Sequence, residues 1–327
     1  MQVVDCHVHL QTRTYFEAHV ERVEPPCAER NNGGYIFRSP GGDRSAIPSS
    51  HYEIEAHLER CAANGVDVVV SSMGRFNVHH LPASRALELA MQLNEEQAEL
   101  ERSYPGRYYG LAMLPMQDAQ AAIETLDHAV RALGLRGVCV SSNVNGDSIA
   151  APTRDPIFRR IDELGVPIFL HPTTGALEPL MRYSHGHSVG CVMDSSIAAL
   201  DLIFSGMLDR HPTLRIVHPH LGGVLPYVAS RIDDDRPGAA IPASLTRRPS
   251  EYLRRFHADT AGLGLGALRM AAEVYGPEQL LYASDYPNRQ PAADLELVYR
   301  DFGGEARDQV LHANAASLLG IGVADAA

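Results

Sequence analysis

The chain has 327 residues, of which 45% are hydrophobic and 21% are charged, and its 40 acidic residues outnumber its 28 basic ones, so that the net charge is −12. These proportions are typical of globular proteins and exclude a disordered or low-complexity chain. The length suits either two ordinary domains or one α/β barrel with insertions. The acidic balance argues against a nucleic-acid partner, because phosphate binding needs clustered positive charge.

The N-terminus and the cysteines indicate a cytoplasmic protein. Asp5 and His7 interrupt the N-terminus, which therefore lacks the pattern of a signal peptide. The apolar runs are too short to span a bilayer, so we expect no membrane partner. The five cysteines form no C-x-x-C pair and are expected to be reduced thiols.

All of the basic residues are arginine, and the chain has no lysine. No Schiff-base lysine, P-loop lysine or carbamylated-lysine metal bridge is therefore possible. Pyridoxal phosphate enzymes, Walker-type NTPases and Schiff-base aldolases are excluded in their usual forms.

Short β-type runs alternate with helical patterns along the chain. The expected strands are Val3–His7, Asp67–Ser72, Tyr108–Met113, Gly137–Ser141, Pro167–His171, Arg215–His220, Phe256–Thr260 and Leu280–Asp285. The expected helices are His51–Ala63, Ser84–Ser103, Ala119–Leu133, Pro156–Leu164, Asp194–Arg210, Gly223–Asp234, Leu265–Tyr275, Ala292–Asp301 and Glu305–Leu319.

This alternation predicts an α/β fold with a parallel sheet and right-handed crossovers. Eight repeats that end in helices predict a (β/α)8 TIM barrel, with residues 1–327 forming a single domain. An open doubly wound sheet is the alternative, which the absence of G-x-G-x-x-G after the first strand disfavours.

Two connections are too long to be simple turns. They are insertions at about 11–50 and 173–190, after the first and the fifth expected strands. Long connections in a compact domain are usually lids, binding loops or subunit contacts. Both follow the carboxyl end of a strand, where a barrel keeps its active site.

His7 and His9 lie at the end of the first expected strand. Side chains at positions i and i+2 of a strand point the same way, so the two imidazoles share one face at the mouth of the barrel. Two neutral imidazoles suit Zn²⁺ or a similar divalent ion. The pairs His185/His187 and His218/His220 have the same spacing but do not follow the first strand.

Three further strand ends carry histidine or aspartate. His171 ends the fifth expected strand, His220 the sixth and Asp285 the eighth. Singly, they could be a core histidine, a turn residue and a helix N-cap. Jointly, His171 and Asp285 complete a ligand set of three nitrogens and one oxygen with the first pair, with a further position for water. His220 is then left beside the metal as an acid/base or orienting group.

Four motifs make the chain resemble the amidohydrolase superfamily: the D-x-H-x-H start, the His-Pro of the fifth strand, the H-x-G-G of the sixth and the S-D-Y-P of the eighth. Within it the chain is most similar to the branch, called amidohydrolase 2, of 2-amino-3-carboxymuconate-6-semialdehyde decarboxylase and related nonoxidative decarboxylases. Further matching stretches are Tyr104–Arg107, Leu114–Gln117, Ser142–Gly146, Ser205–Pro212 and Gly222–Ile232.

The resemblance implies that His7, His9, His171 and Asp285 hold one divalent metal ion per chain, with Zn²⁺ expected and Mn²⁺ the alternative. It makes His220 the catalytic histidine that does not bind the metal, and it places Asp285 near the path of the proton. Binuclear relatives have a carboxylated lysine on the fourth strand. The absence of lysine therefore agrees with a mononuclear site.

The expected substrate is a small-molecule carboxylate. The semialdehyde decarboxylases have Trp after the fifth-strand His-Pro, whereas this chain has Thr173, so a different substrate is expected. Arginine binds carboxylates best, and Arg38 in the first insertion and Arg231 after His220 are the candidates, with His79 as a further substrate contact. In the resembling decarboxylases an arginine at the position of Arg231 reaches the neighbouring subunit's substrate, which predicts a homodimer. The alternative is that Arg231 is a solvated helix arginine.

Three functions remain open. The first is a metal-dependent decarboxylase, a carboxy-lyase, for a small unsaturated or aromatic carboxylic acid. The second is a hydrolase of a lactone, amide or ester, or a hydratase, that uses a metal-activated water with Asp285 as the base and His220 polarising the carbonyl. The third is a metal-binding paralogue without activity, which a full ligand set disfavours.

Overall fold

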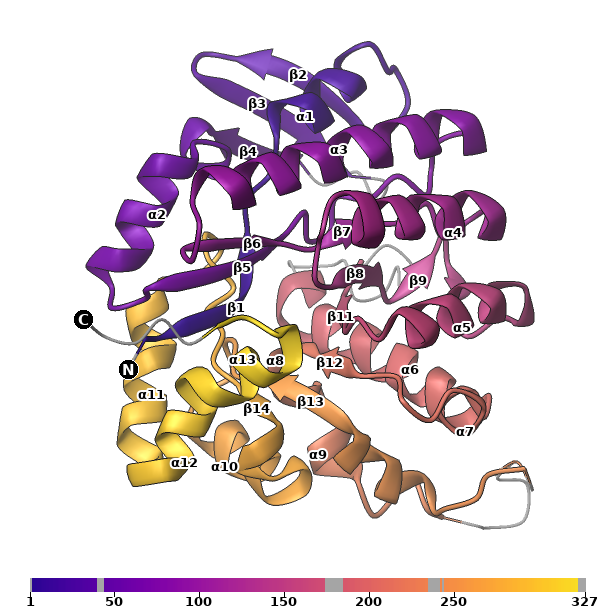
Figure 1. Cartoon of the computed structure of the whole chain (residues 1–327), viewed down its shortest axis with the longest axis vertical. Coiled ribbons are helices and arrows are strands. Elements are labelled where there is room, and N and C mark those ends of the chain that lie inside the picture. Colours follow the sequence, from indigo (N-terminus) through magenta and orange to yellow (C-terminus); the bar gives the residue numbers. More distant parts are fainter. Residues whose placement is uncertain (1, 40–43, 174–184, 235–241, 243, 323–327) are drawn as a thin grey trace.

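The computed structural model describes residues 2–39, 44–173, 185–234, 242 and 244–322 (Figure 1). Its centre is a barrel of parallel strands. They are β1 (Val4–His9), β5 (Val68–Ser72), β6 (Tyr108–Gly110), β7 (Ala112–Met113), β8 (Val138–Ser141), β11 (Ile168–His171), β12 (Ile216–His218), β13 (Phe256–Asp259) and β14 (Leu280–Leu281). β6 and β7 together form one barrel strand that is interrupted at Leu111.

Backbone hydrogen bonds run around the whole barrel. One sheet has the order β1-β5-β6 and the other β14-β13-β12-β11-β8-β7. Between β1 and the segment that follows β14, the Cys6 N–H donates to the Tyr282 carbonyl at 2.9 Å, and the Asp285 N–H donates to the His7 carbonyl at 2.8 Å. These two bonds join the first barrel strand to the last. The expected (β/α)8 architecture is therefore confirmed, and all the strand carboxyl ends meet at one mouth.

Helices surround the barrel strands (Figure 1). They are α2 (Ile54–Ala63), α3 (Ala83–Ser103), α4 (Ala119–Asp127), α5 (Asp155–Leu164), α6 (Cys191–Phe204), α7 (Met207–Arg210), α10 (Leu265–Tyr275), α11 (Pro291–Asp301), α12 (Gly304–Asp308) and α13 (Asn314–Leu319). Large side chains between strands and helices are fully buried, among them Tyr108, Phe158, Phe256 and Tyr282. Each such side chain contributes ~1.5–3 kcal/mol through removal of its surface from water.

Two expected helices differ from those observed. The helix expected at Asp194–Arg210 is broken between α6 and α7, because Gly206 has a φ of +73°. The helix expected at Gly223–Asp234 is reduced to α9 (Leu225–Val228). The glycines at 222 and 223 both have positive φ, so the chain cannot continue a regular helix from the sixth strand.

The first insertion is a small folded unit and not an irregular lid. It contains α1 (Arg13–Val20) and an antiparallel sheet of β2 (Cys27–Asn31), β3 (Gly34–Arg38) and β4 (Arg44–Pro48), beside α3 (Figure 1). Its aromatic side chains form a separate buried cluster, which includes Tyr15, Phe16, Tyr35, Phe37 and Phe76. This cluster anchors β4 over the mouth of the barrel.

The second insertion, expected at 173–190, lies largely outside the described residues. Its described end is a π-helical turn, Gly186–Gly190, that runs directly into α6. The continuous segment Gly186–Phe204 is long and apolar enough to cross a membrane by length and composition, but 50% of it is buried inside the fold. It is therefore accounted for as a core helix of the barrel.

Candidate active site

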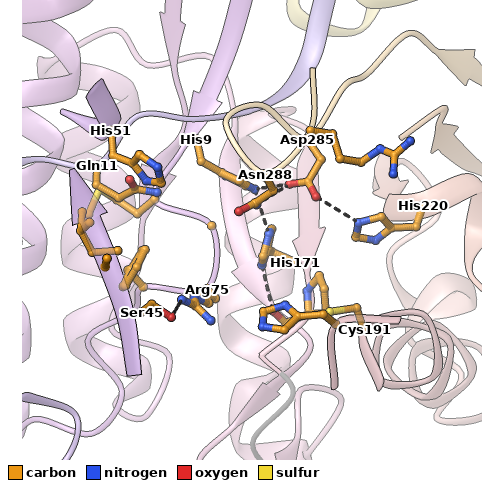
Figure 2. Close-up of a pocket in the computed structure, with 18 residues that line it drawn as sticks. His9, Gln11, Ser45, His51, Arg75, His171, Cys191, His220, Asp285 and Asn288 are labelled. Carbon is orange, nitrogen blue, oxygen red and sulfur yellow. Dashed lines mark hydrogen bonds and ion pairs between the residues drawn. The ribbon is translucent and has the colours of Figure 1, made fainter. Parts of the chain in front are cut away.

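Three imidazoles, those of His7, His9 and His171, and the carboxylate of Asp285 converge at the mouth of the barrel, and Figure 2 shows His9, His171 and Asp285 among them. The Nε2 atom of His9 lies 3.1 Å from Nε2 of His7 and 3.2 Å from Nε2 of His171. Asp285 Oδ1 lies 3.1 Å from His9 Nε2 and 3.8 Å from His7 Nε2. Two ligands of one metal ion at about 2.0–2.1 Å each lie roughly 3 Å apart, so these separations fit a shared ion.

The other ring nitrogen of each histidine has a hydrogen-bond partner. His7 Nδ1 lies 2.7 Å from Asp259 Oδ2, His9 Nδ1 lies 3.2 Å from Ser72 Oγ, and His171 Nδ1 lies 2.9 Å from the Pro172 carbonyl. When each Nδ1–H donates to its partner, the three Nε2 lone pairs are all left for a metal ion. The hydrogen-bond pattern therefore fits the group that the ligand set implies.

Asp259 is a site residue that the sequence analysis missed. It ends β13, where Oδ2 accepts from His7 Nδ1–H and Oδ1 accepts from the His220 N–H at 2.8 Å. One buried carboxylate thus orients both an expected metal ligand and the expected catalytic histidine. The available signal was an aspartate at the end of the seventh strand, level with the other strand ends.

His220 and Asp285 are held in an unusual backbone conformation. Their φ angles are +55° and +62°, and Leu221 after His220 has +56°. Residues other than glycine rarely occupy this left-handed region, and such strain is concentrated at functional sites. The result is that His220 Nε2 and Asp285 Oδ2 face each other at 3.9 Å.

Burial and neighbouring charges decide the protonation of the cluster. Burial alone would raise the pKa of Asp285, but its interactions with His220, His9 and His7 outweigh it and lower the pKa well below its usual range. Burial lowers the pKa of His171 strongly and that of His9 as well, so both rings are neutral. For His7, burial is outweighed by the charge and hydrogen bond of Asp259, which raise the pKa to about 9.

These shifts leave a buried excess of negative charge that needs a cation. Without a metal ion, a proton on His7 partly balances Asp259 and Asp285. A divalent cation at the Nε2 atoms would take over this role and displace the proton, since metal ligands must be deprotonated.

A cavity of about 450 Å³ opens beside the cluster. His9, His171, His220 and Asp285 form part of its wall (Figure 2). Its volume suits a small molecule of the size of a substituted benzene ring. The charged side chains of the described lining are Asp285, Arg75 and Arg289.

The three expected substrate contacts lie elsewhere among the described residues. Arg38 is paired with Glu29 at 2.5 Å within the antiparallel sheet and does not line the cavity. His79 is buried outside the lining, and its carbonyl accepts a hydrogen bond from Asn145. Arg231 is exposed on the segment after α9, on the outside of its own barrel.

The other histidines of the H-x-H pairs lie in different places. His187 lines the cavity, whereas His185 does not. His218 is fully buried, with Nδ1 at 3.5 Å from the Tyr275 hydroxyl, and is a packed core residue.

Arg75 also lines the cavity. The sequence analysis did not single it out, because it belongs to no recognisable motif.

Known proteins resemble this chain over almost its whole length. The model of the family described as amidohydrolase matches residues 4–321. A 2-amino-3-carboxymuconate-6-semialdehyde decarboxylase of Dictyostelium discoideum is 28% identical over 284 residues, which are 84% of this chain and 79% of that protein. A gamma-resorcylate decarboxylase of a Rhizobium species is 30% identical over 250 residues, which are 71% and 76% of the two chains.

Solved structures share the fold. The 5-carboxyvanillate decarboxylase of Sphingomonas paucimobilis superposes with a TM-score of 0.86 at 24% identity, covering 98% of this chain and 99% of the other. A dihydroxybenzoic acid decarboxylase of a Polaromonas species, solved with bound manganese and the inhibitor 2-nitroresorcinol, has a TM-score of 0.81 at 23% identity, with 98% and 97% covered.

Proposed function

Because the chain belongs to the amidohydrolase family, we propose that it is a metal-dependent nonoxidative decarboxylase, a carboxy-lyase, for a small aromatic or unsaturated carboxylic acid. The observation that carries the proposal is the convergence of three Nε2 atoms and Asp285 beside a cavity that His220 also lines. Relatives that act on aromatic acids support the choice of reaction, since one such site geometry serves several chemistries.

His7, His9, His171 and Asp285 would hold the metal ion, which would bind substrate oxygens and stabilise negative charge. Side chains of the protein would supply the proton that the product needs. Asp285 Oδ2 and His220 Nε2 lie 3.9 Å apart at the cavity wall, where either group could deliver a proton to the substrate. When the bond between the substrate carbon and its carboxylate breaks, the electron pair stays on that carbon, which takes this proton as CO₂ leaves.

We propose one metal ion per chain. The chain has no lysine that could become the carboxylated bridge of a binuclear site. Zinc is the ion expected from three imidazoles and one carboxylate, and the manganese in a structural neighbour makes Mn²⁺ the alternative. Elemental analysis of protein purified without added metal, followed by reconstitution with each ion, decides between them.

We also propose a homodimer in which Arg231 reaches the partner's site. Arg231 cannot line its own cavity from the outside of the barrel, and Tyr227 on the same segment is 80% exposed. Exposed aromatic residues beside arginine are typical of protein interfaces. As a cytoplasmic enzyme, the protein would keep its five free cysteines reduced.

The reaction is tested with metal-loaded protein and 2,6-dihydroxybenzoate, 6-methylsalicylate and 5-carboxyvanillate as substrates. Release of CO₂, with one solvent deuterium on the product carbon in D₂O, is the expected result. Solvent ¹⁸O in the product of a lactone, amide or ester, without CO₂ release from any acid, would instead establish the hydrolase.

A further inference from the structure

A buried carboxylate lies behind His171, one of the expected metal ligands. Asp194 on α6 is 7% exposed, and its Oδ2 atom accepts a hydrogen bond from the Thr173 N–H at 2.8 Å. Thr173 is two residues beyond His171, which ends β11. The helix that follows the second insertion therefore contacts the strand end that carries the ligand.

This contact reaches His171 through a single peptide group. The Pro172 carbonyl and the Thr173 N–H belong to the same trans peptide, so they point in opposite directions. The carbonyl lies 2.9 Å from His171 Nδ1, and the N–H donates to Asp194. The peptide is thus held between the imidazole ring on one side and the carboxylate on the other.

Side chains from the neighbouring strand end hold Asp194 in place. Ser142 Oγ donates to Oδ2, and Asn143 Nδ2 donates to Oδ1 at 3.1 Å. Ser142 and Asn143 directly follow β8, which pairs with β11. The Thr173 N–H also has a longer contact of 3.1 Å with Ser142 Oγ. Donors therefore reach both oxygens of the carboxylate, a pattern that suits an acceptor-only group.

The arrangement repeats, with one peptide inserted, the contact that Asp259 makes with His7. There the carboxylate accepts directly from the ring Nδ1–H at 2.7 Å, which orients the ring and raises its basicity as a metal ligand. A peptide N–H that donates to a carboxylate makes a charge-assisted hydrogen bond. Because successive hydrogen bonds polarise one another, the carbonyl of that peptide becomes a stronger acceptor for His171 Nδ1–H.

We propose that Asp194 is a positioning residue for His171 and acts on it through the Pro172–Thr173 peptide. It fixes the orientation of the ring and makes Nε2 a better metal ligand. Asp194 is absent from the described lining of the cavity, so its role is exerted on the ligand and not on the substrate. This inference rests on the metal site of the proposed function.

The test measures zinc affinity of Asp194→Asn by competition with a chromogenic chelator. Asparagine keeps the shape of the side chain but removes its charge, which weakens the bond to the Thr173 N–H. We expect zinc to bind about 3- to 10-fold more weakly than in the wild type. This is less than the roughly 10- to 100-fold effect of a partner in direct contact with a ligand, because only part of the polarisation passes through the peptide.

Two matched variants should bind zinc within about twofold of the wild type. Ser142→Ala leaves the contact between the carboxylate and Thr173 in place. Asp201→Asn removes a carboxylate on the same helix, one that accepts from Ser148 and has no printed contact with the ligand-bearing segment.

A spectroscopic measurement separates this role from a general structural one. In the Co²⁺-loaded protein, the Nδ1–H protons of the three coordinated rings give separate, strongly shifted and exchangeable ¹H signals. Asp194→Asn should move one of them, that of His171. Asp259→Asn should move a different one, that of His7. A general disturbance of the fold would move all three.

Three results would overturn the proposal. They are zinc affinity within about twofold of wild type in Asp194→Asn, an equal loss in Ser142→Ala, and signals that stay unchanged or all move together. If Asp194→Asn does not fold, Asp194→Glu and Asp194→Gln test the charge at equal length. The proposal then requires the Gln variant to bind zinc more weakly than the Glu variant.

The result is separable from the proposed function because no turnover is needed. A selective effect of Asp194→Asn without CO₂ release from any acid would refute decarboxylation and leave the role of Asp194 in place. CO₂ release without that effect would refute only the role of Asp194.

Discussion

Replacing Asp259 by asparagine changes a carboxylate that holds both a candidate metal ligand, His7, and the candidate catalytic histidine, His220. The carboxylate accepts from His7 Nδ1–H at 2.7 Å and from the His220 N–H at 2.8 Å. Asparagine has one acceptor oxygen, so its amide group must face one of these two donors. One contact is therefore lost, and the other loses the ionic part of its strength.

The expected size follows from these two contacts. A buried hydrogen bond to a charged group contributes ~1.5–3 kcal/mol, which is about 10- to 100-fold in an equilibrium. Outer-shell partners of metal-binding histidines have effects of the same order on metal affinity. We therefore expect Asp259→Asn to bind zinc about 10- to 100-fold more weakly, and to have a lower kcat even when saturated with metal, because His220 is no longer anchored.

Competition with a chromogenic chelator measures the affinity, and kcat is then taken at saturating metal. Asp294→Asn is the matched control, because Asp294 is equally buried but contacts the Gly262 N–H and Arg289 and no ligand. It should leave zinc affinity unchanged. Zinc affinity within about threefold of wild type in Asp259→Asn would refute the assigned role.

Four further outcomes are expected. His220→Ala should retain the metal but lose activity by roughly 10²-fold or more, whereas a larger loss in His218→Ala would reverse the assignment. Elemental analysis should give about one ion per chain, and a His7→Ala, His9→Ala double variant should lose it; two ions per wild-type chain would contradict the mononuclear site. Sedimentation should show a homodimer. Arg231→Ala should raise KM at least about tenfold, which corresponds to a loss of about 1.4 kcal/mol of binding free energy, with little loss of stability. A fully active monomer would exclude action across subunits. Without metal, the pKa of His7 is raised to about 9, so the ring is protonated at neutral pH. Calorimetry in several buffers at pH 7 should therefore show about one proton released per metal ion bound, and this number should fall to none well above pH 9. No proton release at pH 7 would show that His7 is neutral beside Asp259.

The sequence by itself determined the architecture and identified the candidate metal ligands. Strand–helix alternation is a local pattern, and the observed barrel strands fall at the expected positions. His7 and His9 share a face because strand side chains alternate. His171, His220 and Asp285 could be brought to them because all parallel strands of a barrel end at one mouth. These inferences need only periodicity and strand order.

Tertiary structure alone decided the partners of those residues. Asp259 contacts His7 and the His220 N–H across 252 and 39 positions of the chain, and no spacing rule relates them. Arg38 ends β3, and Arg75 follows β5. Glu29 pairs with Arg38 away from the cavity, whereas Arg75 donates to Ser45 and lines the cavity. That choice depends on how the aromatic cluster of the first insertion packs its sheet over the barrel mouth. Packing and charge pairing between distant segments therefore selected the residues that line the cavity, because these forces act between surfaces that only the folded chain brings together.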